Sequence, residues 1–194
     1  MNIGIDIDDT LTDLFKTKIK TAKKYIKENN LPYKVVDKTQ VYLSGIFNWS
    51  AEVSQKFWQE KGAEMLSNIS PRKYVREIIQ KLKNENHSII IITARTTDMH
   101  KNPYEISEVW LKKNGIVFDK LLVGKEEKAQ ACLDENIDVF IDDLPKHVSD
   151  VNNNGKTTAI LMQTIANKNL KLDCLRVKNW KQVYKIIKDM EENK

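Results

Sequence analysis

The stretch NIGIDIDDT, residues 2–10, decides the fold class of this 194-residue chain. Its first half is a short apolar run with hydrophobic residues on both sides of the alternation, which is typical of a strand buried on both faces. Its second half is acidic, with Asp6, Asp8 and Asp9 close together. A buried strand that ends in carboxylates predicts a ligand site at the carboxyl end of a parallel sheet.

The rest of the chain alternates strands and helices. Further strands are expected at residues 88–93, 120–123, 139–141, 158–162 and 174–177, and helices at 14–29, 51–66, 71–86, 103–114, 128–135, 146–154 and near the C-terminus. Ser70 and Pro71 form a favourable helix start, with Ser as the N-cap and Pro at the first helical position. This order predicts an α/β fold, a Rossmann-like open parallel sheet with helices on both faces.

The spacing of the strand ends predicts where a second unit is inserted. The segment between Thr10 and Thr93 is far longer than one crossover helix needs, whereas that between Thr93 and Asp142 is filled by helix, strand and helix. We therefore expect a small helical cap inserted after the first strand, at residues 14–70. The remaining residues, 1–13 and 71–194, would form the α/β core domain with the active site.

Composition limits the class of protein. Hydrophobic residues make up 41% and charged residues 30%, with only 6 Gly and 4 Pro, so the chain should be folded nearly end to end. The apolar run around Ile89–Ile92 is too short to cross a bilayer, and no secretory signal pattern precedes Asp6. Cys132 and Cys174 are too few for a disulfide framework. We expect a cytoplasmic protein with no membrane partner.

The net charge of +5 is a weak indication of a polyanionic partner. Only four of the basic residues are arginine, the side chain that best reads phosphates and guanine edges, so a nucleic-acid polymer is not expected as a partner. The densest basic segment, residues 16–27, carries its lysines and apolar residues at helical spacing. We expect its lysines to form the solvated face of a helix.

The residues at the strand ends together describe one reaction. Asp6 can attack a phosphorus atom to form an aspartyl phosphate, and Asp8 can protonate the leaving alkoxide and later accept a proton from water. Carboxylates so close together repel each other and a phosphate dianion, so a cation is required, and oxygen ligands select Mg²⁺. Asp142, at the end of a later strand and followed by Asp143, is the best second ligand.

Other polar groups could hold the phosphoryl oxygens. They are the hydroxyl of Thr93, the backbone N–H groups that follow it, and the ammonium of Lys128, with Lys125 as an alternative. Taken singly, each has an ordinary explanation as a helix cap, a strand end or a surface lysine. Their order along the chain and their common place at strand ends favour phosphate ester hydrolysis.

The segments IGIDIDDTLTD, IIIITART, KEEKAQAC and VFIDDLPK resemble the four ordered motifs of the haloacid dehalogenase superfamily of phosphohydrolases. Within it, the chain is similar to the cytosolic 5′(3′)-deoxyribonucleotidase family and its bacterial members. The characterised nucleotidases tend to carry Gly-Val where this chain has Asp9-Thr10, and Ser-Pro where it has Ala94-Arg95. These differences leave the chemistry intact and affect the choice of substrate.

The resemblance implies a role for each motif residue. Asp6 is the nucleophile, and Asp8 is the acid/base that also lends its backbone carbonyl to Mg²⁺. The remaining roles fall to Asp142 as a direct metal ligand, Asp143 as support outside the direct ligands, and Thr93 and Lys128 as phosphate binders.

In the resembled family a small helical cap closes over the active site, so residues 14–70 should face the leaving group. Aromatic side chains within it could stack on a nucleobase, or form the core of a small helical bundle: Phe47, Trp49, Phe57 and Trp58. Arg95 could reach a substrate phosphate or pair with a carboxylate.

The leading hypothesis is a Mg²⁺-dependent phosphomonoester hydrolase, a 5′-nucleotidase acting on nucleoside monophosphates. A second hypothesis keeps the chemistry but makes the substrate a phosphosugar or another small phosphate ester. Hypotheses from other classes are a receiver-type phosphoacceptor module and a non-catalytic binding protein. A receiver needs its acceptor Asp on an interior strand, where this chain has Thr93, and has no use for a helical insertion. The expected partner is a small phosphate ester, and the pattern specifies no oligomer.

Overall fold

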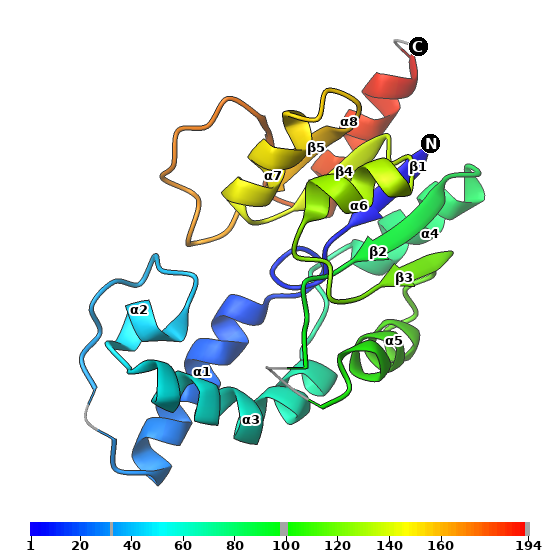
Figure 1. Ribbon diagram of the computed structural model, residues 1–194. Helices are drawn as coiled ribbons and strands as arrows, with labels where there is room; N and C mark the ends of the chain where they lie inside the picture. Colours follow the sequence, from blue (N-terminus) through cyan, green and yellow to red (C-terminus); the bar gives the residue numbers. More distant parts are fainter. Residues whose placement is uncertain (32, 98–100, 193–194) are drawn as a thin grey trace.

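A parallel sheet forms the centre of the protein in a computed structural model that describes residues 1–31, 33–97 and 101–192 (Figure 1). Its six strands lie in the order β3-β2-β1-β4-β5-β6, and each neighbouring pair is parallel. The strands are β1 (Asn2–Ile5), β2 (Ser88–Ile92), β3 (Lys120–Leu122), β4 (Val139–Asp142), β5 (Thr158–Met162) and β6 (Leu175–Val177). The strand order reverses between β1 and β4, which opens a crevice at their carboxyl ends. The predicted open parallel sheet is confirmed.

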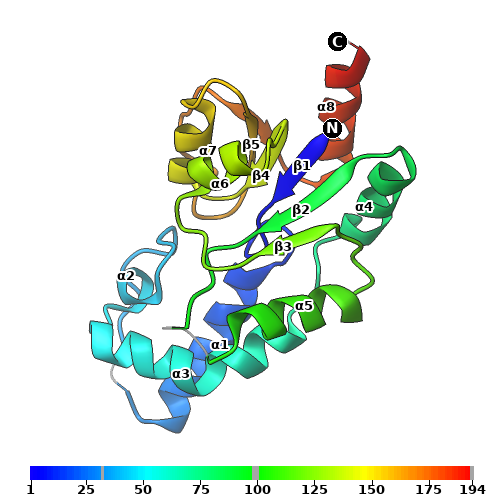
Figure 2. The ribbon, with the colours of Figure 1, turned by 45° about the vertical axis from the view of Figure 1, so that its right-hand side comes forward.

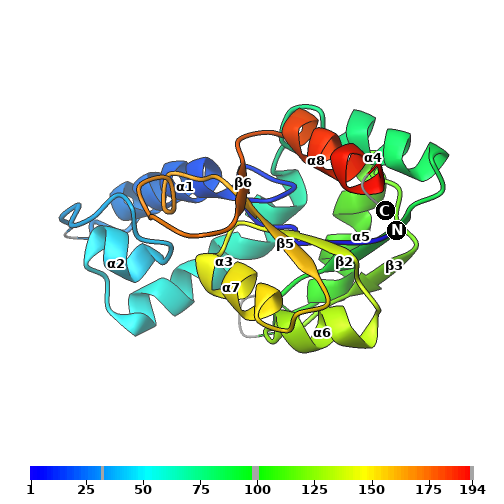
Figure 3. The same ribbon diagram turned by 90° about the horizontal axis from the view of Figure 1, so that it is seen from above.

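The strands bury both of their faces because alternate residues enter two different cores. Ile89 and Ile91 of β2 belong to the larger core, and Ile90 and Ile92 belong to the smaller one. The larger core includes α4 (Val75–Asn84), α5 (Pro103–Lys113) and α8 (Trp180–Glu192), whereas the smaller includes α6 (Lys128–Asp134) and α7 (Pro145–Asn152). Figure 3 shows α4 and α8 on one side of the sheet and α6 and α7 on the other. Helices on both faces are thus confirmed.

Gly4 lets β1 lie close to its neighbour in the middle of the sheet. A Cβ atom at this position would lie 2.9 Å from the Phe140 ring of β4, a distance that real Cβ atoms do not tolerate. The glycine therefore makes room for a large side chain beside the strand that ends directly before Asp6.

The helices α1 (Leu14–Glu28), α2 (Leu43–Phe47) and α3 (Ala51–Asn68) lie between β1 and β2 in the chain, beyond the carboxyl end of β1 in space (Figures 1 and 2). Their apolar side chains join the larger core of the sheet, and Trp110 of α5 donates from Nε1 to the carbonyl of Ile69 at 2.7 Å. The division into a cap and a core domain at residues 14–70 stays a prediction. Among the described residues, no helix has the length and apolar character needed to span a membrane.

The predicted helix start at Ser70 and Pro71 is wrong. Pro71 instead forms an antiparallel bridge with Thr12, and the N–H of Arg72 donates to the carbonyl of Leu11 at 2.8 Å, so α4 begins only at Val75. These backbone groups pair with the loop after β1 and are unavailable to a helix. The five-residue helix α2 was not predicted, because so short a segment carries no periodicity.

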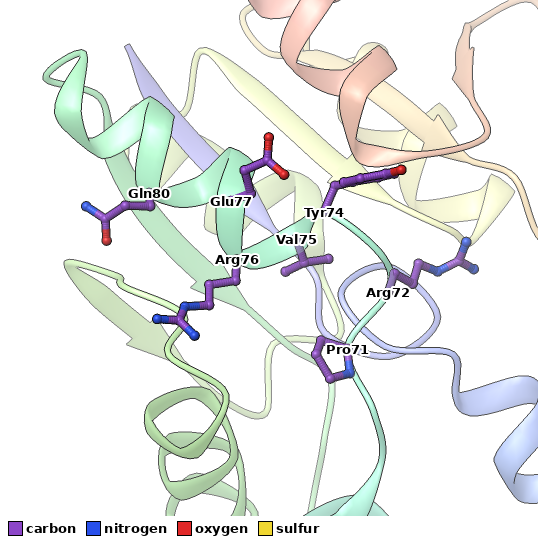
Figure 4. A pocket seen from close by; sticks show the side chains of 7 residues that line it. All are labelled: Pro71, Arg72, Tyr74, Val75, Arg76, Glu77 and Gln80. Carbon is purple, nitrogen blue, oxygen red and sulfur yellow. The ribbon is translucent and has the colours of Figure 1, made fainter.

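A shallow groove of about 540 Å³ lies at the start of α4 and is lined by residues 71–80 alone. Arg72 and Arg76 point away from each other there (Figure 4). None of the predicted site residues lines this groove.

Candidate active site

Asp6, Asp8, Thr93, Asp142 and Asp143, predicted from the strand ends, line one cavity of about 500 Å³ at the carboxyl ends of β1, β2 and β4. Lys128 is not part of this lining and contacts Asp6 instead. The core side of its wall includes Asp6, Asp8, Asp9, Thr93, Arg95, Asp142, Asp143 and His147. The helical segment after β1 contributes Leu14, Lys18, the segment 41–44, Ser54 and Trp58. Residues from widely separated parts of the sequence therefore meet at the edge where a parallel sheet places its ligands.

Asp6 and Lys128 form a buried ion pair at the centre of the site. Lys128 Nζ lies 2.8 Å from Asp6 Oδ1 and also donates to the carbonyl of Ile92, which fixes the ammonium at the end of β2. Burial raises the pKa of Asp6 to about 7, with added repulsion from Asp142 and Asp8, although Lys128 acts in the opposite direction. The nucleophile candidate thus lies in a strongly desolvated position.

The two candidate lysines lie in different environments. The side chain of Lys128 is buried against Asp6, whereas Lys125 is exposed and contributes its backbone N–H to the carbonyl of Thr93 at 2.9 Å. Thr93 itself is buried at the end of β2, where its Oγ1 accepts a hydrogen bond from the Arg95 N–H at 3.4 Å. The geometry favours Lys128 as the cation beside the nucleophile.

Asp6, Asp142 and Asp143 each offer a carboxylate oxygen, and these atoms lie within 4.8 Å of one another. All three residues are buried. Asp142 Oδ1 accepts a hydrogen bond from the N–H of Leu144 at 2.7 Å, and its Oδ2 lies 2.9 Å from His147 Nδ1. Burial and the neighbouring charge of Asp142 raise the pKa of Asp143 well above its ordinary value. A buried set of hard oxygen donors with excess negative charge fits a divalent cation such as Mg²⁺.

The carboxylate of Asp8 is held by Arg95 rather than by this acidic cluster. Arg95 Nε and Nη2 donate to the two oxygens of Asp8 at 2.8 and 2.7 Å, and its Nη1 donates to Ser107 Oγ at 3.1 Å. Of the two expectations for Arg95, the structure shows the pair with a carboxylate. A bidentate pair of this kind fixes the direction of both side chains. The implied role of Asp8 as a metal ligand concerned its backbone carbonyl and stays a prediction.

The four aromatic residues expected at the substrate pocket divide into two groups. Phe47, Trp49 and Phe57 are buried. Trp49 and Phe57 pack against Tyr25, whose ring centre lies 5.4 Å from that of Phe57, and Phe47 packs against Trp49. Among these four aromatic residues, Trp58 is the one that lines the cavity. Phe47, Trp49 and Phe57 thus form part of a helical core, whereas stacking on a base stays a prediction for Trp58.

No role was predicted for Asp9 from the sequence, and the structure shows it capping a helix. Its φ of 58° lies in the left-handed region that favours glycine. Its Oδ1 accepts a hydrogen bond from the N–H of Phe15 at 2.7 Å and so caps the first turn of α1. Burial raises the pKa of Asp9 to about 6, with Lys18 acting in the opposite direction.

Sequence reasoning missed Lys18 and His147 as members of the site. Lys18 belongs to a row of lysines expected in solvent, and its burial depends on how the 41–44 segment folds over it. His147 follows Asp142 by five residues and contacts it from the first turns of α7. The sequence signal that could have indicated His147 is a histidine five residues after an acid at a strand end.

Solved structures with a similar fold are hydrolases. A haloacid dehalogenase-like hydrolase from Xanthomonas campestris superposes with a TM-score of 0.65 at 15% identity, covering 100% of this chain and 92% of that one. Protein SP0104 of Streptococcus pneumoniae, of the same haloacid dehalogenase-like family, gives 0.63 at 13% identity, covering 96% and 97%. At these identities the likeness establishes the fold alone.

The particular family follows from the sequence. Residues 1–192 match the model of the family described as 5′ nucleotidase, deoxy (pyrimidine), cytosolic type C protein (NT5C), and the chain belongs to that family. Nucleotidase CA_C3379 of Clostridium acetobutylicum is 30% identical over 188 residues, which cover 96% of this chain and 93% of the relative. The protein is thus a phosphatase of the nucleotidase type.

Proposed function

We propose that this protein is a Mg²⁺-dependent phosphomonoester hydrolase that acts as a 5′-nucleotidase on nucleoside monophosphates, through an aspartyl phosphate at Asp6. The observation that carries the proposal is the set of buried carboxylates of Asp6, Asp142 and Asp143 in one cavity, with Lys128 paired to Asp6. Asp6, Asp142 and Asp143, with the carbonyl of Asp8, would hold Mg²⁺. The ion would neutralise the charge of the phosphoryl group and the carboxylates.

Hydrolysis proceeds in two displacements at phosphorus. A carboxylate oxygen of Asp6 attacks phosphorus, the bond to the leaving oxygen breaks, and Asp8 gives that oxygen a proton. Asp8 then takes a proton from water as the water oxygen attacks phosphorus, and the bond to Asp6 breaks to release inorganic phosphate. Arg95 holds both oxygens of Asp8 and so fixes the direction of the carboxylate that exchanges these protons.

Two core residues stabilise the phosphoryl oxygens during both displacements. The ammonium of Lys128 is already desolvated and fixed, so it offsets developing charge without reorganising. The hydroxyl of Thr93 donates to a second oxygen.

Family membership and the cavity wall support a nucleotide substrate. The family is described by its nucleotidase activity and as a cytosolic type, and we extend both the substrate and the cytoplasmic location to this chain. Trp58 offers a flat ring on the cavity wall on which a base can stack. The second candidate is a phosphosugar or another small phosphate ester, which the same core chemistry would serve.

A substrate panel tests the proposal. The purified protein is assayed with Mg²⁺ against ribo- and deoxyribonucleoside monophosphates, sugar phosphates and phenyl phosphate, with Asp6→Asn as the control for contaminating phosphatase. We expect phosphate release from nucleoside monophosphates with the highest kcat/KM. A preference for sugar phosphates would favour the second candidate, and no release from any ester would overturn the proposal.

Adjacent residues of α3 provide a matched test of the pocket. Trp58→Ala should lower the ratio of kcat/KM for nucleotide over phenyl phosphate by roughly one to two orders of magnitude, because a stacked base contributes about 1–3 kcal/mol. Phe57→Ala should leave that ratio unchanged but lower Tm, since it opens a cavity that costs about 3–5 kcal/mol. An unchanged ratio in both variants would count against base stacking on Trp58.

A further inference from the structure

Lys18 differs from the other lysines of α1. Five of the six, Lys16, Lys20, Lys23, Lys24 and Lys27, are exposed, as the helical pattern predicted. Lys18 is only 4% exposed and lines the catalytic cavity. Burial of an ammonium group is costly unless it gains compensating partners, so its position calls for an explanation.

The ammonium of Lys18 is only partly satisfied by the protein. Its Nζ donates to the carbonyl of Val41 at 2.6 Å, and it lies 5.3 Å from the centre of the Phe15 ring. In the described part of the chain, no other acceptor lies at hydrogen-bond distance from Nζ. An ammonium has three N–H donors, so two remain for a molecule in the cavity.

The charges around Lys18 restrict what that molecule can be. Asp9, Asp143 and Asp8 all act on its ammonium and favour its charged form, although burial lowers its pKa overall. Because these carboxylates already offset the charge of Lys18, the ammonium needs no second anionic group from the substrate. An apolar group would leave two buried N–H donors unpaired. The group that fits is an uncharged oxygen acceptor.

Lys18 and Lys128 extend from different elements. Lys128 extends from α6 and holds the nucleophile candidate Asp6. Lys18 extends from α1 and lines the cavity together with Trp58, on which the leaving base is proposed to stack. Lys18 is therefore on the leaving-group side of the cavity.

We propose that Lys18 is a specificity-determining residue that hydrogen-bonds an uncharged oxygen of the leaving group, such as a sugar hydroxyl or ring oxygen, and so selects sugar-bearing phosphate esters. This role rests on the proposed phosphatase function and holds for a nucleotide or a phosphosugar. A site built to hydrogen-bond a substrate oxygen discriminates strongly against an analogue that lacks it.

The test compares Lys18→Met with Lys20→Met, an exposed lysine of the same helix. For each variant, kcat/KM is measured with a nucleoside monophosphate and with phenyl phosphate, whose leaving group has no second oxygen. Lys18→Met should lose roughly 10- to 100-fold on the nucleotide and change little on phenyl phosphate. Lys20→Met should match the wild type on both.

Product inhibition distinguishes a loss of substrate recognition in Lys18→Met from a loss of folding stability. Lys18→Met should weaken inhibition by the free nucleoside and leave inhibition by inorganic phosphate unchanged, whereas a displaced 41–44 segment or a damaged fold would lower Tm and affect both. Lys18→Arg, which keeps the charge and the donors, should recover part of the nucleotide preference.

The outcomes distinguish this role from the proposed function. If the wild type hydrolyses both esters and Lys18→Met lowers both by the same factor, or neither, the role of Lys18 is overturned and the phosphatase function stands. If the wild type hydrolyses no phosphate ester, the proposed function itself fails. If sugar phosphates are the better substrates, the same comparison is made with them in place of the nucleotide.

Discussion

Two clusters of possible metal ligands, one at each end of the sheet, have similar distances between their ligand atoms but differ in how their charge is balanced. At the carboxyl ends of the strands, Asp6, Asp142 and Asp143 bring oxygens within 4.8 Å of one another. Near the amino end of β2, carboxylate oxygens of Glu85 and Glu191 and a ring nitrogen of His87 also lie within 4.8 Å of one another. By distances alone, either group could hold a metal ion.

The amino-end cluster is balanced by the chain itself. Lys188 Nζ lies 2.6 Å from Glu191 and 3.5 Å from Glu85, and Tyr184 donates its hydroxyl to Glu85 at 2.7 Å. The hydrogen bond from Lys188 lowers the pKa of Glu191. Its carboxylates therefore carry their charge without a further cation.

The carboxyl-end cluster is not balanced in this way. Lys128 contacts Asp6, yet burial still raises the pKa of Asp6 to about 7, and the pKa of Asp143 is raised as well. The folded chain thus holds more negative charge here than its own cations offset. The comparison teaches that charge balance, rather than ligand spacing, distinguishes a metal site from a structural ion-pair network.

Asp6→Asn has the largest expected effect and tests the carboxyl-end cluster directly. We expect turnover to fall to the background rate, because the nucleophile is lost at nearly constant volume. Without added metal, Tm should stay equal or rise, since one of the repelling carboxylates is neutralised. Phosphate release and Tm are measured on the same preparation. Retained turnover would contradict the role of Asp6, and a large fall in Tm would contradict the account of repulsion.

Metal removal is the second test. Chelation should stop turnover and Mg²⁺ should restore it, and Mg²⁺ should raise Tm because it binds the folded protein alone. Asp142→Asn should reduce this rise in Tm, whereas Glu191→Gln at the other cluster should leave it unchanged. A Mg²⁺-induced rise that depended on Glu191 would reverse the assignment of the two clusters.

Lys128→Met removes the ammonium that is paired with Asp6 and so makes the carboxyl-end cluster still less balanced. We expect kcat/KM to fall about 10²- to 10³-fold, as for the loss of one preorganised electrostatic contact. Lys125→Met, three residues away and exposed, should change it little. Stability should fall by less than the ~3–5 kcal/mol typical of a broken buried pair, because Asp6 can take up a proton instead. Equal losses in both variants would mean that Lys125 shares the role.

The sheet and most of the site were predictable because both follow from local patterns. A continuous apolar run such as Ile89–Ile92 indicates a strand buried on both faces, and parallel strands end at one edge. Residues at strand ends, such as Asp6, Thr93 and Asp142, must then converge, whatever the length of chain between them.

Features that depend on tertiary packing could not be predicted. Lys18 follows the same helical pattern as its exposed neighbours and is buried because the carbonyl of Val41 reaches its ammonium. Arg95 and Asp8 lie 87 positions apart, and no local signal joins them. Phe57 and Trp58 are adjacent in sequence, and which of them faces the cavity is decided by how α3 packs.

Substitution of His87 has the smallest expected effect and tests the amino-end cluster of Glu85, His87 and Glu191 alone. Burial lowers the pKa of His87 below its ordinary value of about 6.5, although Glu191 and Glu85 oppose the shift. A histidine with a lower pKa in the folded than in the unfolded state is harder to protonate when folded. Its contribution to stability is therefore fully present above about pH 6.5 and is lost as the pH falls below that value.

His87→Gln removes the protonation and keeps a polar side chain of similar reach. Denaturation midpoints of wild type and variant are measured at pH 7.5 and 5.5 with saturating Mg²⁺, so that the carboxylates at the other end stay ionised in both. Without Mg²⁺, their raised pKa values would act in the opposite direction, because protonating Asp6 and Asp143 relieves repulsion as the pH falls. We expect the wild type to lose more stability than His87→Gln between the two pH values. Equal losses would mean that His87 takes up its proton as readily in the folded as in the unfolded protein, beside Glu191, and that the amino-end cluster does not respond to pH.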